Sequence, residues 1–207
     1  MASKRVILGI DPGTRILGFG VISVIGNKLS LKELGVINLK KEETHFLVLQ
    51  RILLEVSKLV RKYRPDEMAI EAPFYGKNPQ TMLKLGRAQG AAISAALLKD
   101  IPIYEYAPTS VKLSVTGKGA ASKEQVASMV QAILGFSCQV KYLDATDAVA
   151  IALCHYYNSN TLSSQVTKEK KVVSLSRGVG KRGWEDFVKA NPSRTITGIN
   201  RRKKTTD

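Results

Sequence analysis

The sequence is poor in cysteine and histidine, and it has no long apolar run. It contains two cysteines, Cys138 and Cys154, and two histidines among 207 residues. Two distant cysteines match neither a zinc-ligand spacing nor a disulfide framework. The absence of about 18 consecutive apolar residues argues against a membrane span, and the N-terminus has too few apolar residues for a signal peptide. We therefore expect a cytoplasmic protein with reduced thiols and no membrane partner.

Acidic residues are scarce relative to basic ones. The chain has 17 Asp and Glu against 32 Lys and Arg, a net charge of +15. Residues 1–157 carry 20 basic and 13 acidic side chains, a net of +7, whereas residues 158–207 carry 12 and 4, a net of +8. Such an excess favours a polyanionic partner, most often nucleic acid.

The apolar periodicity predicts three consecutive strands, followed by strands that alternate with helices, and then two further helices. Helical crossovers make the later strands parallel to the first. We therefore expect an α/β fold, a mixed five-stranded sheet flanked by helices, over residues 1–157. Residues 158–207 are expected to form a basic, mostly flexible tail. The predicted strands are 5–10, 17–25, 29–38, 68–70 and 103–106, and the predicted helices are 46–63, 79–99, one from 108, 123–134 and 144–157.

Four acidic residues lie at positions that a buried core disfavours. Asp11 ends an apolar strand in VILGIDPGT, and Glu71 ends a later one in MAIEAPF. Asp144 and Asp147, in YLDATDAVAIALCH, are three residues apart and therefore share a helix face. Each has an ordinary explanation. Asp11 suits a turn, Glu71 suits a salt-bridged strand end, and the other two suit the start of a helix.

Considered together, the four carboxylates favour a metal site. Parallel first and fourth strands place Asp11 beside Glu71, and four like charges in one place repel unless cations neutralise them. Oxygen ligands without His or Cys suit Mg²⁺ or Mn²⁺. Two such ions can activate a water and stabilise the leaving oxygen of a phosphodiester. The pattern therefore predicts two Mg²⁺ ions per active site, with Mn²⁺ as a substitute.

Four segments closely resemble the RuvC family of bacterial Holliday-junction resolvases, which have a ribonuclease H-like fold. The resemblance implies that Asp11, Glu71, Asp144 and Asp147 are catalytic metal ligands. It also implies a homodimer that makes paired cuts in four-way junction DNA and works with the RuvA–RuvB branch-migration complex. The basic tail is longer than we expect for the family. The segments are GIDPGTRILGFGVI, AIEAPFYGKNPQTMLKLGRAQGA, YEYAPTSVKLSVTGKGAASKEQV and DATDAVAIALCH.

Three lysines lie in or beside the glycine-containing loop TGKGAASK. A lysine near the scissile phosphate can hold the strand and offset developing charge. The resemblance implies roles in DNA binding and catalysis for Lys112 and Lys123, and Lys123 is our candidate for catalysis. Lys118 lies in the same loop and is a candidate for a phosphate contact without a catalytic role. A solvated helix lysine remains the alternative for Lys112 and Lys123, and the loop lacks the spacing of a nucleotide-binding P-loop.

Two aromatic residues, Phe74 and Tyr75, follow Glu71 in a loop that also contains Lys77. Aromatic side chains beside a nuclease site can stack on unpaired bases. The resemblance implies that an aromatic residue here contacts junction bases, and Phe74 is the closer match. The alternative is that one ring covers the rim of the core. We expect Lys77 to contact DNA and read His155 as structural.

The helix over residues 79–98 is rich in small side chains, LGRAQGAAISAALL. Gly86 and Gly90 are four residues apart, as are Ala91 and Ala95, and small side chains at this spacing allow two helices to approach closely. This stripe is our candidate dimer interface, and packing on its own sheet is the alternative.

The sequence thus predicts a Mg²⁺-dependent crossover junction endodeoxyribonuclease, a hydrolase of DNA recombination and repair. Two other functions compete with it. Actin-like sugar kinases also begin with a strand, an Asp-containing turn and a second strand, but they need two such lobes. A non-catalytic junction-binding protein would have the fold without the metals.

Overall fold

The computed structural model describes residues 4–73, 78–137 and 143–165, and its five strands form one sheet of order β3-β2-β1-β4-β5. The first three strands are antiparallel neighbours, joined between β2 and β3 by a tight turn at Gly26. β4 and β5 are parallel to β1 and to each other. The strands are β1 (Lys4–Asp11), β2 (Ile16–Ile25), β3 (Lys28–Asn38), β4 (Glu67–Glu71) and β5 (Ile103–Tyr106).

Within residues 4–165, as far as the structure describes them, five helices connect or follow the strands, and their ends carry the expected local signals. Thr44 caps the first helix by accepting a hydrogen bond from the Leu47 N–H, and Asn78 caps the second, which has Pro79 in its first turn. Ser122 and Gln125 form a capping box. The helices are α1 (His45–Tyr63), α2 (Pro79–Leu97), α3 (Pro108–Thr116), α4 (Lys123–Leu134) and α5 (Leu143–Gln165).

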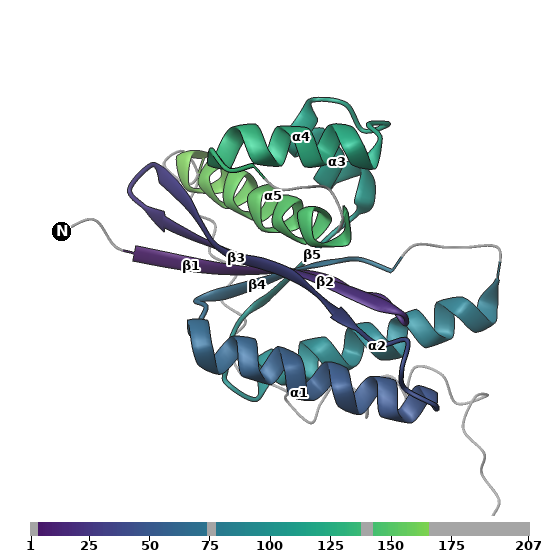
Figure 1. The fold of residues 1–207 in the computed structure, drawn as a ribbon. Coiled ribbons are helices and arrows are strands. Elements are labelled where there is room, and N and C mark those ends of the chain that lie inside the picture. Colours follow the sequence, from purple (N-terminus) through teal and green to yellow (C-terminus); the bar gives the residue numbers. More distant parts are fainter. Residues whose placement is uncertain (1–3, 74–77, 138–142, 166–207) are drawn as a thin grey trace, which may run out of the picture. The chain divides into compact units, whose positions relative to one another are not determined.

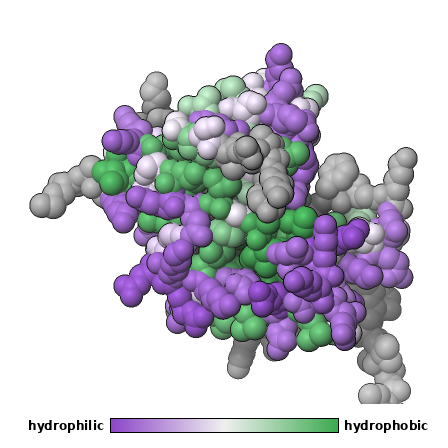
Figure 2. All heavy atoms as spheres, in the orientation of Figure 1, coloured by the Kyte–Doolittle hydropathy of each residue, from purple (hydrophilic) through white to green (hydrophobic). Residues whose placement is uncertain are grey.

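The helices cover the two faces of the sheet unequally. α1 and α2 lie on one face, while α5 lies on the other with α3 and α4 outside it (Figure 1). Alternate residues of β1 explain the division: Leu8 and Ile10 belong to the core beneath α1 and α2, whereas Ile7 packs beneath α5. Hydrophilic side chains cover much of the outer helical surface in the same view (Figure 2).

The mixed five-stranded α/β sheet predicted from the sequence is confirmed. One helix differs from its predicted length, because α5 continues to Gln165 rather than ending near Tyr157. Asn158 donates to the Cys154 carbonyl, and Ser159 accepts a hydrogen bond from Arg5 at 2.9 Å, so this extra length is tied to the first strand. The greater part of the predicted tail, residues 166–207, lies outside the described residues. Within the described part of the chain, none of the helices combines the length and apolar character that a membrane crossing requires.

Candidate active site

Two of the four carboxylates lie at the same edge of the sheet. β1 ends at Asp11 and β4 ends at Glu71, and Ile10 pairs with Ile70 in the parallel ladder between these strands. The next residue on each strand is therefore a carboxylate, and the two are neighbours. Rigid strand ends fix side-chain positions better than loops do.

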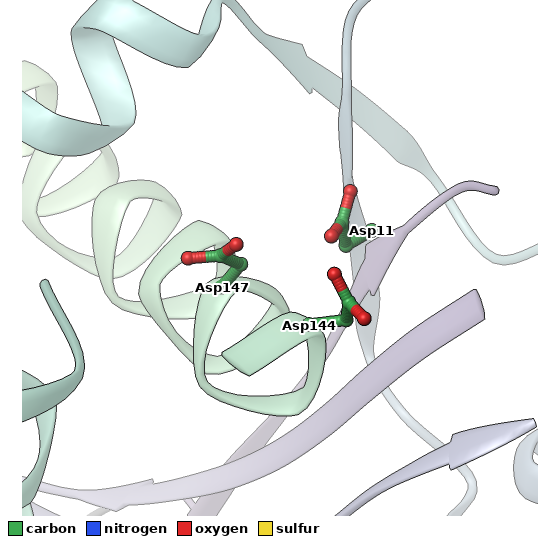
Figure 3. Close-up of side chains that lie close together, drawn as sticks. All are labelled: Asp11, Asp144 and Asp147. Atoms are coloured by element: carbon green, nitrogen blue, oxygen red, sulfur yellow. The ribbon is translucent and has the colours of Figure 1, made fainter. Parts of the chain in front are cut away.

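The other two carboxylates come from the first turns of α5, on the side that faces Asp11 (Figure 3). One oxygen from each of Asp11, Asp144 and Asp147 can be chosen so that all three lie within 4.8 Å of one another, a grouping that can hold a metal ion. Glu71 is not part of this close group. It lines the same cavity as Asp11 and Asp147, whose volume is about 200 Å³.

Burial and mutual repulsion weaken the acidity of Asp11, Glu71 and Asp147. The pKa of Asp11 is raised to about 8, chiefly by burial and further by the negative charges of Glu71, Asp147 and Asp144, while Lys123 opposes the shift. Burial is also the main reason that the pKa values of Glu71 and Asp147 are raised. The protein alone therefore compensates only part of the negative charge that it gathers here.

Among the residues that the structure describes, Lys123 supplies the positive charge that contacts these carboxylates. Its Nζ lies 2.7 Å from Asp147 Oδ2 and 3.3 Å from Asp144 Oδ1. Burial acts to lower the pKa of Lys123, but the hydrogen bond to Asp147 and the surrounding carboxylates raise it overall. The positively charged ammonium group therefore contacts two of the carboxylates, as a bound metal ion would.

The other predicted lysines have different surroundings. Lys112 lines the carboxylate cavity, together with Pro108, Val111 and Val126. Lys118 is exposed and lines a separate shallow hollow beside Glu124. Phe74, Tyr75 and Lys77 lie outside the described residues, so their placement stays a prediction.

Sequence reasoning missed Gln89, a buried residue of α2. Its Nε2 donates to the carbonyl oxygen of Glu71 at 3.2 Å and to Glu105 Oε1 at 3.0 Å. Gln89 therefore ties the end of β4 to α2. A lone amide on the apolar side of an otherwise small-residue helix was the available signal.

His155 is 2% exposed and makes structural contacts, as expected from the sequence. Nδ1 lies 2.7 Å from the Tyr106 hydroxyl, Nε2 lies 2.8 Å from Glu67 Oε2, and the ring stacks on Tyr104. Arg5 also pairs with Glu67. Cys154 is buried in the same helix, and Cys138 lies outside the described residues.

The donor set fits a hard divalent cation. All of its ligand atoms are carboxylate oxygens, no His or Cys side chain belongs to the described group, and the raised pKa values mark a place where added positive charge is stabilised. Such a site at the ends of parallel strands, lined by two lysines, suits chemistry on a phosphate ester.

Comparisons with known proteins agree with this chemistry. The family model described as "Crossover junction endodeoxyribonuclease RuvC" matches residues 7–155. A relative of that name from Cytophaga hutchinsonii is 50% identical over 193 residues, which cover 93% of this chain and 89% of the relative. The solved structure of Thermus thermophilus RuvC is 35% identical, with a TM-score of 0.68 over 75% of this chain and 96% of that one. The structure of the same Thermus protein with a Holliday junction substrate has a TM-score of 0.68 at 33% identity, over 76% and 96%.

Proposed function

This chain belongs to the RuvC family of crossover junction endodeoxyribonucleases, and on that basis we propose that it resolves Holliday junctions by hydrolysing DNA strands at the carboxylate site. The observation that carries the proposal is the meeting of Asp11, Asp144 and Asp147 within 4.8 Å, in a chain with a net charge of +15. The basic surface attracts the DNA, and the acidic centre provides the chemistry.

Asp11, Glu71, Asp144 and Asp147 would hold two Mg²⁺ ions, with Mn²⁺ as a substitute. When bound, the ions supply a more acidic water as nucleophile and stabilise the leaving oxygen, which leaves 5′-phosphate ends. The carboxylates must be ionised to serve as ligands, and the positive charge of the ions would oppose the raised pKa values of Asp11, Glu71 and Asp147.

Lys123 and Lys112 would act on the phosphate. Lys123 contacts Asp144 and Asp147 in the protein alone. With metal bound, its ammonium group is free to turn toward a phosphate oxygen and offset the charge that develops there. Lys112 lines the same cavity and would hold the strand, while exposed Lys118 would bind phosphate farther along the DNA.

The two symmetric cuts require two active sites, which a two-fold homodimer supplies. Part of the small-residue stripe cannot contribute, because Ala95 is buried in the core of its own chain. Gly86 and Gly90 instead face open space, and Leu83 beside them is 61% exposed. We place the dimer contact on this outer side of α2.

The remaining partners follow from family membership. The enzyme would act in the cytoplasm on four-way junctions in recombination and repair, together with the RuvA–RuvB branch-migration complex. Phe74, Tyr75 and Lys77 would contact the junction beside the site, with Phe74 stacking on an unpaired base.

The test is incubation of the full chain with a mobile four-way junction and Mg²⁺, followed by mapping of both cut strands. We expect symmetric paired cuts, no cuts in a linear duplex of the same sequence, and no reaction in EDTA. ATP turnover without cleavage would favour the kinase alternative. A gel shift without cuts in Mg²⁺ or Mn²⁺ would favour the non-catalytic binder.

A further inference from the structure

Three strand glycines lie beneath α5. Gly9 is directly opposite Gly20 in the β1–β2 ladder, and Asp11 is opposite Gly18. Residues two apart on a strand, and residues directly opposite on paired strands, project from the same face of a sheet. All three glycines therefore share the face of Asp11.

These glycines touch the backbone of the helix itself. A Cβ atom on Gly18 would lie 2.0 Å from the Asp144 carbonyl oxygen, and one on Gly9 would lie 2.0 Å from the Ala148 carbonyl oxygen. A Cβ on Gly20 would lie 2.8 Å from the Val149 nitrogen. Backbone atoms cannot swing aside as the end of a side chain can, so any side chain here must push the helix away from the sheet.

Gly18 differs from the other two because it touches a carboxylate residue directly. It is the ladder partner of Asp11 and the contact of Asp144, so three backbone segments meet there. Figure 3 shows Asp144 at this end of α5, beside Asp11. Real Cβ atoms keep more than 3.0 Å from such neighbours, so an alanine at position 18 requires a shift of about 1 Å.

We infer that Gly18 is a positioning residue of the metal site: its lack of a side chain sets the separation between Asp11 and Asp144. The inference rests on the proposed metal-dependent function. Metal ligands tolerate little displacement, and loss of a residue that orients them typically weakens metal binding or activity by 10- to 100-fold. A misplacement of about 1 Å has effects of similar size on reaction rates.

A side chain at Gly18 could also reduce activity simply by destabilising the fold, and Gly35 provides a matched control for that explanation. It is also a strand glycine, and its Cβ would lie 2.8 Å from the Phe19 ring. Phe19 belongs to the core on the α1 and α2 side, so strain at Gly35 does not reach α5. Gly20 is an equivalent tight position that does touch α5, with its closest neighbour, Val149 Cγ2, at 2.5 Å.

The experiment compares Gly18→Ala, Gly20→Ala and Gly35→Ala for Mn²⁺ binding without DNA, measured by electron paramagnetic resonance, and for thermal unfolding. We expect Gly18→Ala to weaken Mn²⁺ binding by at least tenfold and to raise the Mg²⁺ concentration for half-maximal cleavage in parallel. Gly20→Ala should have an intermediate effect. Gly35→Ala should lower the melting temperature and leave Mn²⁺ affinity within twofold of the wild type.

A second variant distinguishes displacement from general damage. Asp144→Glu extends the ligand by one methylene, so it should restore part of the Mn²⁺ affinity in the Gly18→Ala background while weakening binding in the wild-type background. If Gly18→Ala does not fold, the test is the comparison of Mn²⁺ affinity between Gly20→Ala, which strains α5, and Gly35→Ala, which does not. Equal Mn²⁺ affinity in that pair, or wild-type affinity in a folded Gly18→Ala, would overturn the inference. A wild type that binds no Mn²⁺ would instead reject the proposed function.

Discussion

Helix α5 carries two polar clusters that differ in how their charges are matched. Near its start, Asp144 and Asp147 face Asp11, and burial together with like charge raises the pKa of Asp11 to about 8. Farther along, His155 meets Glu67 and Tyr106, and each of its ring nitrogens has a partner within 2.8 Å. Burial lowers the pKa of His155 and so favours the neutral ring, while the hydrogen bond to Glu67 opposes this shift.

The two clusters therefore have different roles: one fixes α5 in the fold, and the other provides groups for chemistry. The His155 cluster is satisfied within the protein, so it stabilises the fold and has no capacity left for a ligand. The carboxylate cluster is only partly neutralised within the protein, so added positive charge stabilises it. In α5, His155 thus stabilises the position of the helix, while Asp144 and Asp147 in the first turns face the candidate active site. Four changes test this comparison.

The largest effect is expected from Asp144→Asn. The change removes a proposed metal ligand, so cleavage of a four-way junction in Mg²⁺ should fall on the order of a thousandfold. Junction binding, measured by gel shift in EDTA, should be unchanged or tighter because a negative charge leaves a basic protein. Cleavage within tenfold of the wild type would show that Asp144 is not a ligand.

His155→Ala should affect stability instead of chemistry. Loss of a buried ring and its hydrogen bonds should lower the free energy of unfolding by about 3 kcal/mol, and each kcal/mol lowers the melting temperature by about 2–4 °C. Met129→Ala, an exposed change on α4, is the control and should stay within about 0.5 kcal/mol. A His155→Ala protein that stays as stable as the wild type but no longer cuts would reverse the assignment of the two clusters.

Asp11→Asn should make the metal-free protein more stable at alkaline pH. Folding raises the pKa of Asp11 from 3.8 to about 8, so its stabilising contribution is present below pH 4 and is lost as the pH rises through 8. A neutral amide at position 11 avoids that loss. We expect the free energy of unfolding of Asp11→Asn to exceed that of the wild type by about 2 kcal/mol at pH 9, and the difference should vanish near pH 4. Urea unfolding in EDTA measures it, with Asp100→Asn as the control. A gain that does not change with pH would contradict the electrostatic cause.

Tyr106→Phe should have the smallest effect. It removes the hydroxyl that lies 2.7 Å from His155 Nδ1 and keeps the ring, so the free energy of unfolding should fall by about 1 kcal/mol. Cleavage should be unaffected. A loss larger than that of His155→Ala would mean that the hydroxyl, and not the imidazole, is the centre of the cluster.

The features predicted correctly from the sequence were those with a local signature. Apolar strands that end in Asp11 and Glu71 indicated where the carboxylates would gather, since carboxyl ends of parallel strands share an edge. The hydrogen bonds of Gln89 and the contact of Gly18 with Asp144 depend on residues far away in the chain, so no periodicity shows them. The length of α5 was underestimated because the residues beyond Tyr157 are polar, and the hydrogen bond from Arg5 to Ser159 depends on a residue far away in the chain.

The hydrogen bond between Arg5 and Ser159 joins residues 154 positions apart. The ribosome makes the chain from its N-terminus, so β1 is synthesised long before α5, and contacts between the two cannot form until α5 has been made. Asp11 meets Asp144 and Asp147 only when α5 docks, which makes the nuclease centre one of the last features to form. An unfinished chain would therefore be harmless to DNA, and cutting activity would begin only once the domain closes.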